Sequence, residues 1–146
     1  MSAGTWTLYN NARKKLVTGV IDLDTSVLRC KLYKGAAAAS VSVSTLSLLS
    51  QIGTTNETAN VSDYTLSGVD ITAIAASATH KFTANNLVIS ASGGAASVQY
   101  AVVYNSLSAA GGHVLMWCKL STAAFVVTDT NTLTINTPTN GFFVIY

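Results

Sequence analysis

The sequence predicts an all-β domain, an antiparallel β-sandwich of the jelly-roll kind with a short N-terminal helix. About eight short runs of strand-forming residues recur at spacings of roughly 8–15 residues, with turn residues between them. Several of these runs alternate apolar and polar side chains, which is the period of a half-buried strand. No repeat of fixed period is visible, and this disfavours a propeller or a solenoid.

Composition indicates one domain spanning residues 1–146, long enough to bury a core without metals or disulfides. Charged residues make up 10% of the chain, against about 25% in a typical soluble domain. The surface must therefore be covered by small polar side chains or by other protein, which favours a component of an assembly over a free enzyme.

The charge and hydropathy patterns exclude several classes of partner. The net charge is +2 and the only basic run is Arg13-Lys14-Lys15, so we expect no direct sequence-specific binding of nucleic acid. No run of about 18 apolar residues exists, so we expect no membrane span. The first residues lack the apolar core of a signal peptide, and we expect the mature chain to begin at Met1.

The N-terminal segment, residues 1–20, carries the best helical signal. Apolar and aromatic side chains recur every three or four residues from Trp6 to Val20, basic residues come late, and Gly19 can end the helix. We predict a helix over Thr5–Thr18. A strand over Val27–Tyr33 follows, with Leu28, Cys30 and Leu32 on one face and Arg29 and Lys31 on the other.

The next segments are less regular. Gly35–Ser40 fits either a loop or a helix fragment, whereas Val41–Thr45 alternates like a strand. The leucines of Leu46–Ile52 indicate one or two helical turns. Gly53–Ser62 has the composition of a polar loop, and strand signals return at Tyr64–Ile74.

Leu87–Tyr104 is predicted to be the central hairpin of the sheet. Two strand-like runs flank Gly93-Gly94, and paired glycines favour a tight reversal. Asn85-Asn86 marks the turn before it. The apolar run His113–Leu120 is typical of a strand buried on both faces or of one at a sheet–sheet or subunit contact. The last predicted strands are Phe125–Thr128, Thr132–Ile135 and Gly141–Tyr146, with Pro138 between the final two.

No catalytic, cofactor-binding or metal-binding site is expected. His80 and His113 are far apart, no serine lies in a nucleophile motif, and neither glycine pair precedes a helix and a lysine. Asp22 and Asp24 are interpreted as turn residues. Cys30 and Cys118 alternate with aliphatic residues and are predicted to be buried thiols, although a disulfide between neighbouring strands stays open. The scattered aromatic residues fit a core, a sugar site or a protein contact.

Three stretches taken together resemble small virion proteins of tailed bacteriophages. The first is WTLYNNARKKLVTGVIDLDTSVLRCKLYKGA, Trp6–Ala36, which contains the family's G-x-I-D-L-D-T. The second, Asn56–Ile71, is similar to an N-E … Y-T-x-G-G segment, and the third, Phe82–Ser106, to a strand pair containing A-x-Y-A-V-I-Y. Ser67 replaces the first glycine of the family's pair, and Ser90 stands near a position where an aromatic residue is common.

The resemblance implies a capsid decoration, or cement, protein with a β-sandwich fold and no catalytic residues. Its partner would be the major capsid protein. The chain would be made in the host cytoplasm and would lie on the capsid surface as a homo-oligomer, trimer or dimer. A tail, neck or fibre-associated structural protein and a glycan-binding module for the host surface are the alternatives. We expect the assembly interface to include Trp6, Tyr9, Arg13, Lys14 and Lys15, since aromatic anchors beside basic side chains are typical of interfaces; the alternative is that Trp6 caps the core.

Overall fold

The computed structural model describes residues 4–23, 27–59, 68–71, 73–76, 81–106, 112–138 and 141–144. In this part of the chain the protein is mostly β, and every strand pairing is antiparallel. The prediction of an all-β, antiparallel protein is confirmed.

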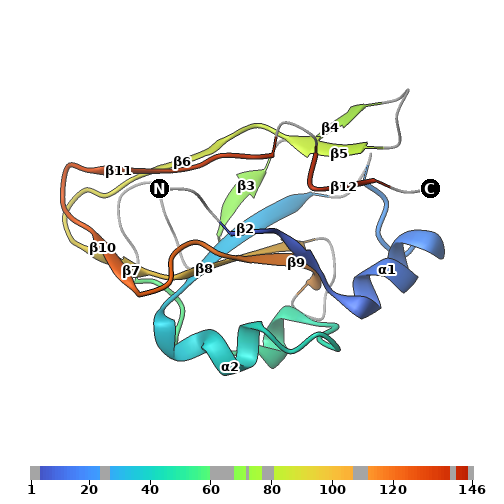
Figure 1. Ribbon diagram of the computed structural model, residues 1–146, viewed down its shortest axis with the longest axis horizontal. Helices are drawn as coiled ribbons and strands as arrows, with labels where there is room; N and C mark the ends of the chain where they lie inside the picture. Colours follow the sequence, from blue (N-terminus) through green and yellow to red (C-terminus); the bar gives the residue numbers. More distant parts are fainter. Residues whose placement is uncertain are drawn as a thin grey trace.

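A five-stranded sheet forms the centre of the molecule (Figure 1). Its order is β1-β9-β8-β2-β3, made of Thr7–Leu8, His113–Lys119, Tyr100–Asn105, Leu28–Tyr33 and Val69–Ile71. All six residues of β8 are buried, because β8 pairs with β2 on one side and with β9 on the other, and both of its faces are covered. The predicted strands Val27–Tyr33 and His113–Leu120 correspond to β2 and β9 and are confirmed.

Further strands lie above this sheet and at one end of it (Figure 1). β6 pairs with β11, β7 pairs with β10, and β5 lies between β12 and β4. Their bounds are Ala73–Ala76 (β4), Lys81–Ala84 (β5), Leu87–Ser90 (β6), Ala96–Val98 (β7), Phe125–Val127 (β10), Thr132–Ile135 (β11) and Phe143–Val144 (β12). The strand predicted at Tyr64–Ile74 corresponds in part to β3 and β4, and its residues 64–67 and 72 lie outside the described residues.

The predicted hairpin across Gly93-Gly94 is wrong. The chain does reverse direction there, but β6 pairs with β11 and β7 pairs with β10, so the two strands flanking the glycines are not partners. The loop between β10 and β11 follows the same bend: Ala91 N–H donates to Asn131 O, and Thr130 N–H donates to Ala91 O. One two-stranded ribbon therefore folds over at this bend, and an alternating pattern predicts a buried face without identifying the neighbouring strand.

Two hydrophobic clusters cover the two faces of the central sheet. One joins the sheet to β6, β7, β10 and β11, and its members include Leu32, Ile89, Val98, Val127 and Ile135. The other includes side chains of the helical segments and of the sheet, among them Ala12, Val41, Leu49, Val102 and Leu115. Figure 1 shows the helices on the side of the sheet opposite β6 and β11.

The N-terminal helix is shorter than predicted. α1 spans Asn10–Val17, and the residues before it form β1, in which Thr7 lies opposite Trp117 of β9. The prediction of a helix from Thr5 is wrong because β1 provides backbone partners to the edge of β9. The predicted end is confirmed: Gly19 has φ +72°, and Val20 N–H donates to Lys15 O as in a Schellman motif.

Residues 35–52 are mostly helical turns. η1 (Gly35–Ala37), α2 (Ala38–Val41) and η2 (Leu49–Gln51) follow one another below the sheet. The predicted strand Val41–Thr45 is wrong, since Val41 ends α2 and is fully buried there, where its carbonyl accepts a hydrogen bond from the Tyr9 hydroxyl at 2.7 Å. The helical turn predicted within Leu46–Ile52 is present as η2.

Candidate functional site

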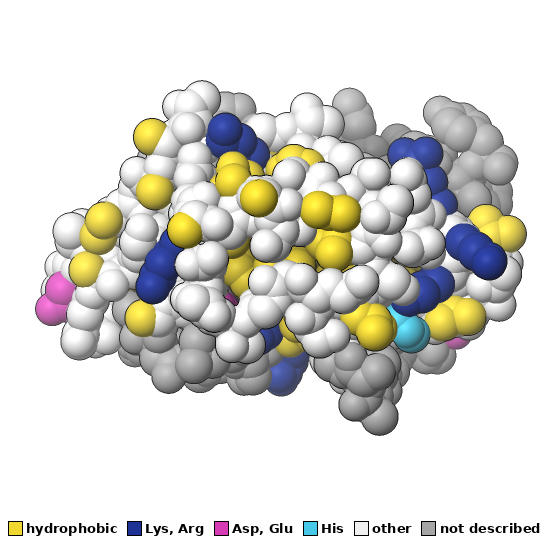
Figure 2. Space-filling view, turned by 90° about the horizontal axis from the view of Figure 1, so that it is seen from below, with side chains coloured by type: hydrophobic (Ala, Val, Ile, Leu, Met, Phe, Trp, Pro, Cys, Tyr) yellow, Lys and Arg dark blue, Asp and Glu magenta, His cyan; other side chains and the backbone are white. Residues whose placement is uncertain are grey.

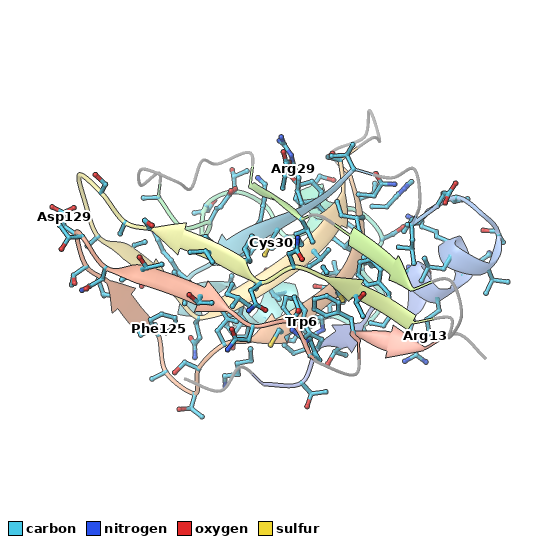
Figure 3. The ribbon with its side chains drawn as sticks, turned by 90° about the horizontal axis from the view of Figure 1, so that it is seen from above. Trp6, Arg13, Arg29, Cys30, Phe125 and Asp129 are labelled. Carbon is cyan, nitrogen blue, oxygen red and sulfur yellow. The ribbon has the colours of Figure 1, made fainter. Side chains whose placement is uncertain are left out.

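The residues predicted for an assembly interface are divided between core and surface. Tyr9 is fully buried, and its hydroxyl donates to Val41 O. Trp6 is half-buried and packs against both hydrophobic clusters, with its ring edge-on to Phe142 at a centroid distance of 5.1 Å. Figure 3 shows Trp6 near the middle of the molecule and Arg13 at the end that carries α1. The two aromatic rings are therefore parts of the packed interior of the isolated chain.

The three basic residues lie on α1. Arg13 and Lys14 are exposed, and no ion pair to a described carboxylate involves either of them. Lys15 is half-buried, and its Nζ donates to Ser47 Oγ at 2.8 Å and to Ser47 O at 3.1 Å. The pKa of His113 is lowered, first by partial burial and second by the nearby charge of Lys15. Arg13 and Lys14 are thus the members of the basic run that are available to a partner.

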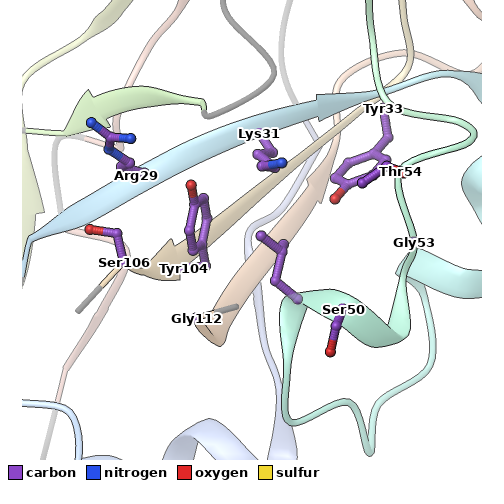
Figure 4. A pocket seen from close by; sticks show the side chains of 10 residues that line it. Arg29, Lys31, Tyr33, Ser50, Gly53, Thr54, Tyr104, Ser106 and Gly112 are labelled. Carbon is purple, nitrogen blue, oxygen red and sulfur yellow. The ribbon is translucent and has the colours of Figure 1, made fainter. Parts of the chain in front are cut away.

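A cavity that the sequence did not predict lies against the central sheet on its helical side (Figure 4). Its volume is about 580 Å³, which is within the range of small-molecule sites. Arg29, Lys31 and Tyr33 of β2 and Tyr104 of β8 contribute side chains to its floor. The remaining lining residues come from the segment around η2 and from the ends of β8 and β9: Leu49, Ser50, Gly53, Thr54, Ser106 and Gly112.

Both cations of the cavity have carboxylate partners. Arg29 Nε lies 2.6 Å from Asp70 Oδ1, and both of these side chains are partly exposed. Lys31 Nζ lies 2.8 Å from Glu57 Oε2, and the Glu57 side chain is fully buried. The polar loop predicted at Gly53–Ser62 therefore contains a buried carboxylate that sequence reasoning missed. The available signal was that Lys31 lies in an otherwise buried strand, where a cation needs a partner.

The two tyrosines of the cavity keep their hydroxyl protons over the physiological range. Burial raises the pKa of Tyr33, and the charge of Glu57 raises it further. Burial also raises the pKa of Tyr104, while the neighbouring Arg29 opposes this shift. With its cations paired and its phenols neutral, the cavity can donate and accept hydrogen bonds but presents little net charge.

The cysteines are buried free thiols, as predicted. Cys30 lies on β2 and Cys118 on β9, with β8 between them, so they are not on neighbouring strands. Burial raises the pKa of Cys30 to about 12 and that of Cys118 to about 11. Neither thiol is suited to nucleophilic chemistry, which requires a thiolate that can reach its substrate.

Within the described ranges, no three His, Cys, Asp or Glu side chains are placed to share a metal ion. None of the helices in this part of the chain combines the length and hydropathy needed to traverse a lipid bilayer.

Fold and surface together define an antiparallel, mostly β domain with a basic helix at one end and, at the other, a ribbon bend that carries Asp129. No protein-family model matches the chain, and the searches of curated proteins and of solved structures found no match.

Proposed function

We propose that this chain is a structural protein of a tailed-bacteriophage virion, attached to the capsid surface as a decoration protein. The observation that carries the proposal is that the three stretches resembling such virion proteins are adjacent in space. β2 of the first stretch pairs with β3 of the second and with β8 of the third. Glu57 of the second stretch pairs with Lys31 of the first. Segments that resemble one family in order and also contact one another are expected of a shared fold.

The architecture supports a role as a clamp. We propose that the two strand layers form one β-sandwich of the jelly-roll kind, since a continuous apolar cluster packs between them. Such a domain is rigid, and each clamp across a junction adds contacts that must break before capsid subunits separate. The role is non-enzymatic, its partner is the major capsid protein, and closed symmetry on the shell favours a trimer or a dimer.

The test is the copy number in purified particles, measured by quantitative mass spectrometry and located in an averaged cryo-electron microscopy map. A decoration protein approaches the copy number of the major capsid subunit and covers its lattice. A few copies, with density at the neck or tail, would replace this proposal by the tail or neck alternative. Absence from the particle would overturn both.

The cavity favours a second candidate, a module that binds a neutral glycan of the host surface. The hydroxyl groups of serine, threonine and tyrosine side chains line the cavity, and both of its cations have carboxylate partners. This lining suits an uncharged ligand that is rich in hydroxyl groups. Tyr33 and Tyr104 are almost completely buried, so they would contact a ligand through the hydroxyl ends of their rings. Binding of host-surface saccharides by the isolated protein, measured by saturation-transfer NMR, should be weakened by Tyr104→Phe and unchanged by Tyr100→Phe. No binding by the wild-type protein would eliminate this candidate.

A further inference from the structure

The outer side of α1 combines apolar and basic side chains. Val17 is 83% exposed, and Val20, just beyond the helix, is 53% exposed. The inner side carries Ala12, which is fully buried, and Leu16, which packs against the core. An exposed β-branched residue in the last turn neither adds to the core nor favours helix formation. These two valines therefore have no evident stabilising role in the isolated chain.

Arg13 and Lys14 lie one helical turn from Val17. Spacings of four and three residues place side chains next to each other on a helix, so both cations flank this valine. We call Arg13, Lys14, Val17 and Val20 the α1 surface. In Figure 2 basic and hydrophobic side chains lie side by side at the end of the molecule that carries α1. The α1 surface has an apolar centre and two cations without a described carboxylate partner.

The helix is held rigidly by the loop that follows α2. Asn10 N–H donates to Ser44 O at 2.9 Å, Asn11 Nδ2 donates to Thr45 O at 2.6 Å, and Lys15 Nζ donates to Ser47. The Schellman motif at Gly19 fixes the other end. Because both ends are tied, a partner meets a preorganised surface and loses little free energy in ordering it.

We propose that the α1 surface docks onto an acidic face of the virion shell, with Val17 and Val20 in an apolar contact and Arg13 and Lys14 opposite carboxylates. The identity of the partner, the major capsid protein, rests on the proposed function. Charge complementarity selects an acidic protein surface, since carboxylates at the rim of the contact would complement the two cations beside the apolar centre.

The experiment measures binding of the purified protein to particles of the encoding phage that lack it, by co-sedimentation over a range of concentrations. The test variant is Val17→Ser/Val20→Ser. The control makes the same chemical change at two other exposed valines, Val88→Ser/Val126→Ser, which are 54% and 56% exposed and lie on β6 and β10. We expect the test variant to raise Kd at least about tenfold. The control should stay within about twofold, as for surface changes away from a contact.

A second variant tests the cations. Arg13→Gln/Lys14→Gln should weaken binding and flatten its dependence on salt concentration, because fewer charged contacts remain to be screened. Circular dichroism and thermal melts establish that each variant is folded.

The outcomes separate the two proposals. Wild-type binding with no loss in Val17→Ser/Val20→Ser, or an equal loss in the control pair, overturns the α1 surface and leaves the decoration role standing. Failure of the wild-type protein to bind overturns the decoration role and, with it, the capsid as partner of the α1 surface.

Discussion

At the scale of single residues, the first prediction concerns the ion pair between Lys31 and Glu57. The Glu57 side chain is fully buried, so removing Lys31 takes away the cation that lies beside a buried carboxylate. We expect Lys31→Met to lower the free energy of unfolding by about 3 kcal/mol or more. Urea denaturation monitored by circular dichroism measures this change.

Two controls accompany that variant. Asp70→Asn breaks the exposed pair with Arg29 and should cost under about 1 kcal/mol. The double variant Lys31→Met/Glu57→Leu replaces both charges by apolar groups and should recover most of the loss. A cost for Lys31→Met no larger than that for Asp70→Asn would contradict the importance of the buried pair.

The two thiols give the second prediction at this scale. Burial raises the pKa of Cys30 to about 12 and that of Cys118 to about 11, from an ordinary value of 9.0. In the native protein both should be unreactive toward a thiol reagent at about pH 8 and should react on unfolding. Rapid labelling of either thiol in the native protein would contradict the prediction that both cysteines are inaccessible.

The same shifts set the direction of a pH dependence. Folding holds these thiols protonated, so their contribution to stability is complete below pH 9 and declines as pH rises toward 12. Denaturation midpoints across this range should therefore fall with rising pH. Substitution of both cysteines by alanine should reduce the slope.

At the scale of elements, the bend between β6 and β7 depends on one of its two glycines. Gly93 has φ +78°, and its N–H donates to Asp129 Oδ1, whereas no positive φ is recorded for Gly94. A Cβ at either position would meet no atom within 4 Å. Alanine at either position therefore causes no steric clash, and a comparison of the two alanine variants tests the backbone conformation alone.

Gly93→Ala should lower the free energy of unfolding by about 1–2 kcal/mol, because an L-residue is strained in the left-handed region. Gly94→Ala should be close to neutral. Thermal or urea denaturation of the two variants measures the difference. Equal effects would show that the left-handed conformation of Gly93 does not limit the bend.

At the scale of the whole molecule, Trp6 connects parts that are far apart in the sequence. It packs against both hydrophobic clusters and edge-on to Phe142 near the C-terminus. Its Nε1 is buried and has no hydrogen-bond acceptor among the described residues. Trp6→Ala should lower the free energy of unfolding by about 2–3 kcal/mol, less than for a fully buried tryptophan.

Trp6→Phe keeps much of the contact and removes the unsatisfied N–H, so it should cost clearly less than Trp6→Ala. Capsid binding by the folded fraction of Trp6→Ala separates the two roles considered for this residue. A core role predicts normal binding by that fraction. Weakened binding at unchanged stability would instead identify Trp6 as an interface anchor.

Local patterns of the sequence determined which residues are buried and in which elements. Runs of strand-forming residues located β2, β8, β9, β10 and β11. Gly19 marked the end of α1, and aliphatic neighbours identified both cysteines as interior. Burial and turn chemistry are local properties, since they depend on a side chain and its near neighbours in the chain.

Only the tertiary structure decided which segments are partners. The predicted hairpin at Gly93-Gly94 was wrong because β6 pairs with β11 and β7 pairs with β10. These pairings join residues that are about 30–50 positions apart in the sequence. The sequence did not predict Glu57 as the partner of Lys31, because Glu57 lies in a segment with the composition of a loop. Val41 lies in α2, and not in the predicted strand, because α2 places it against Tyr9 in the core. In each case a favourable long-range contact outweighed a local preference of less than about 1 kcal/mol per residue.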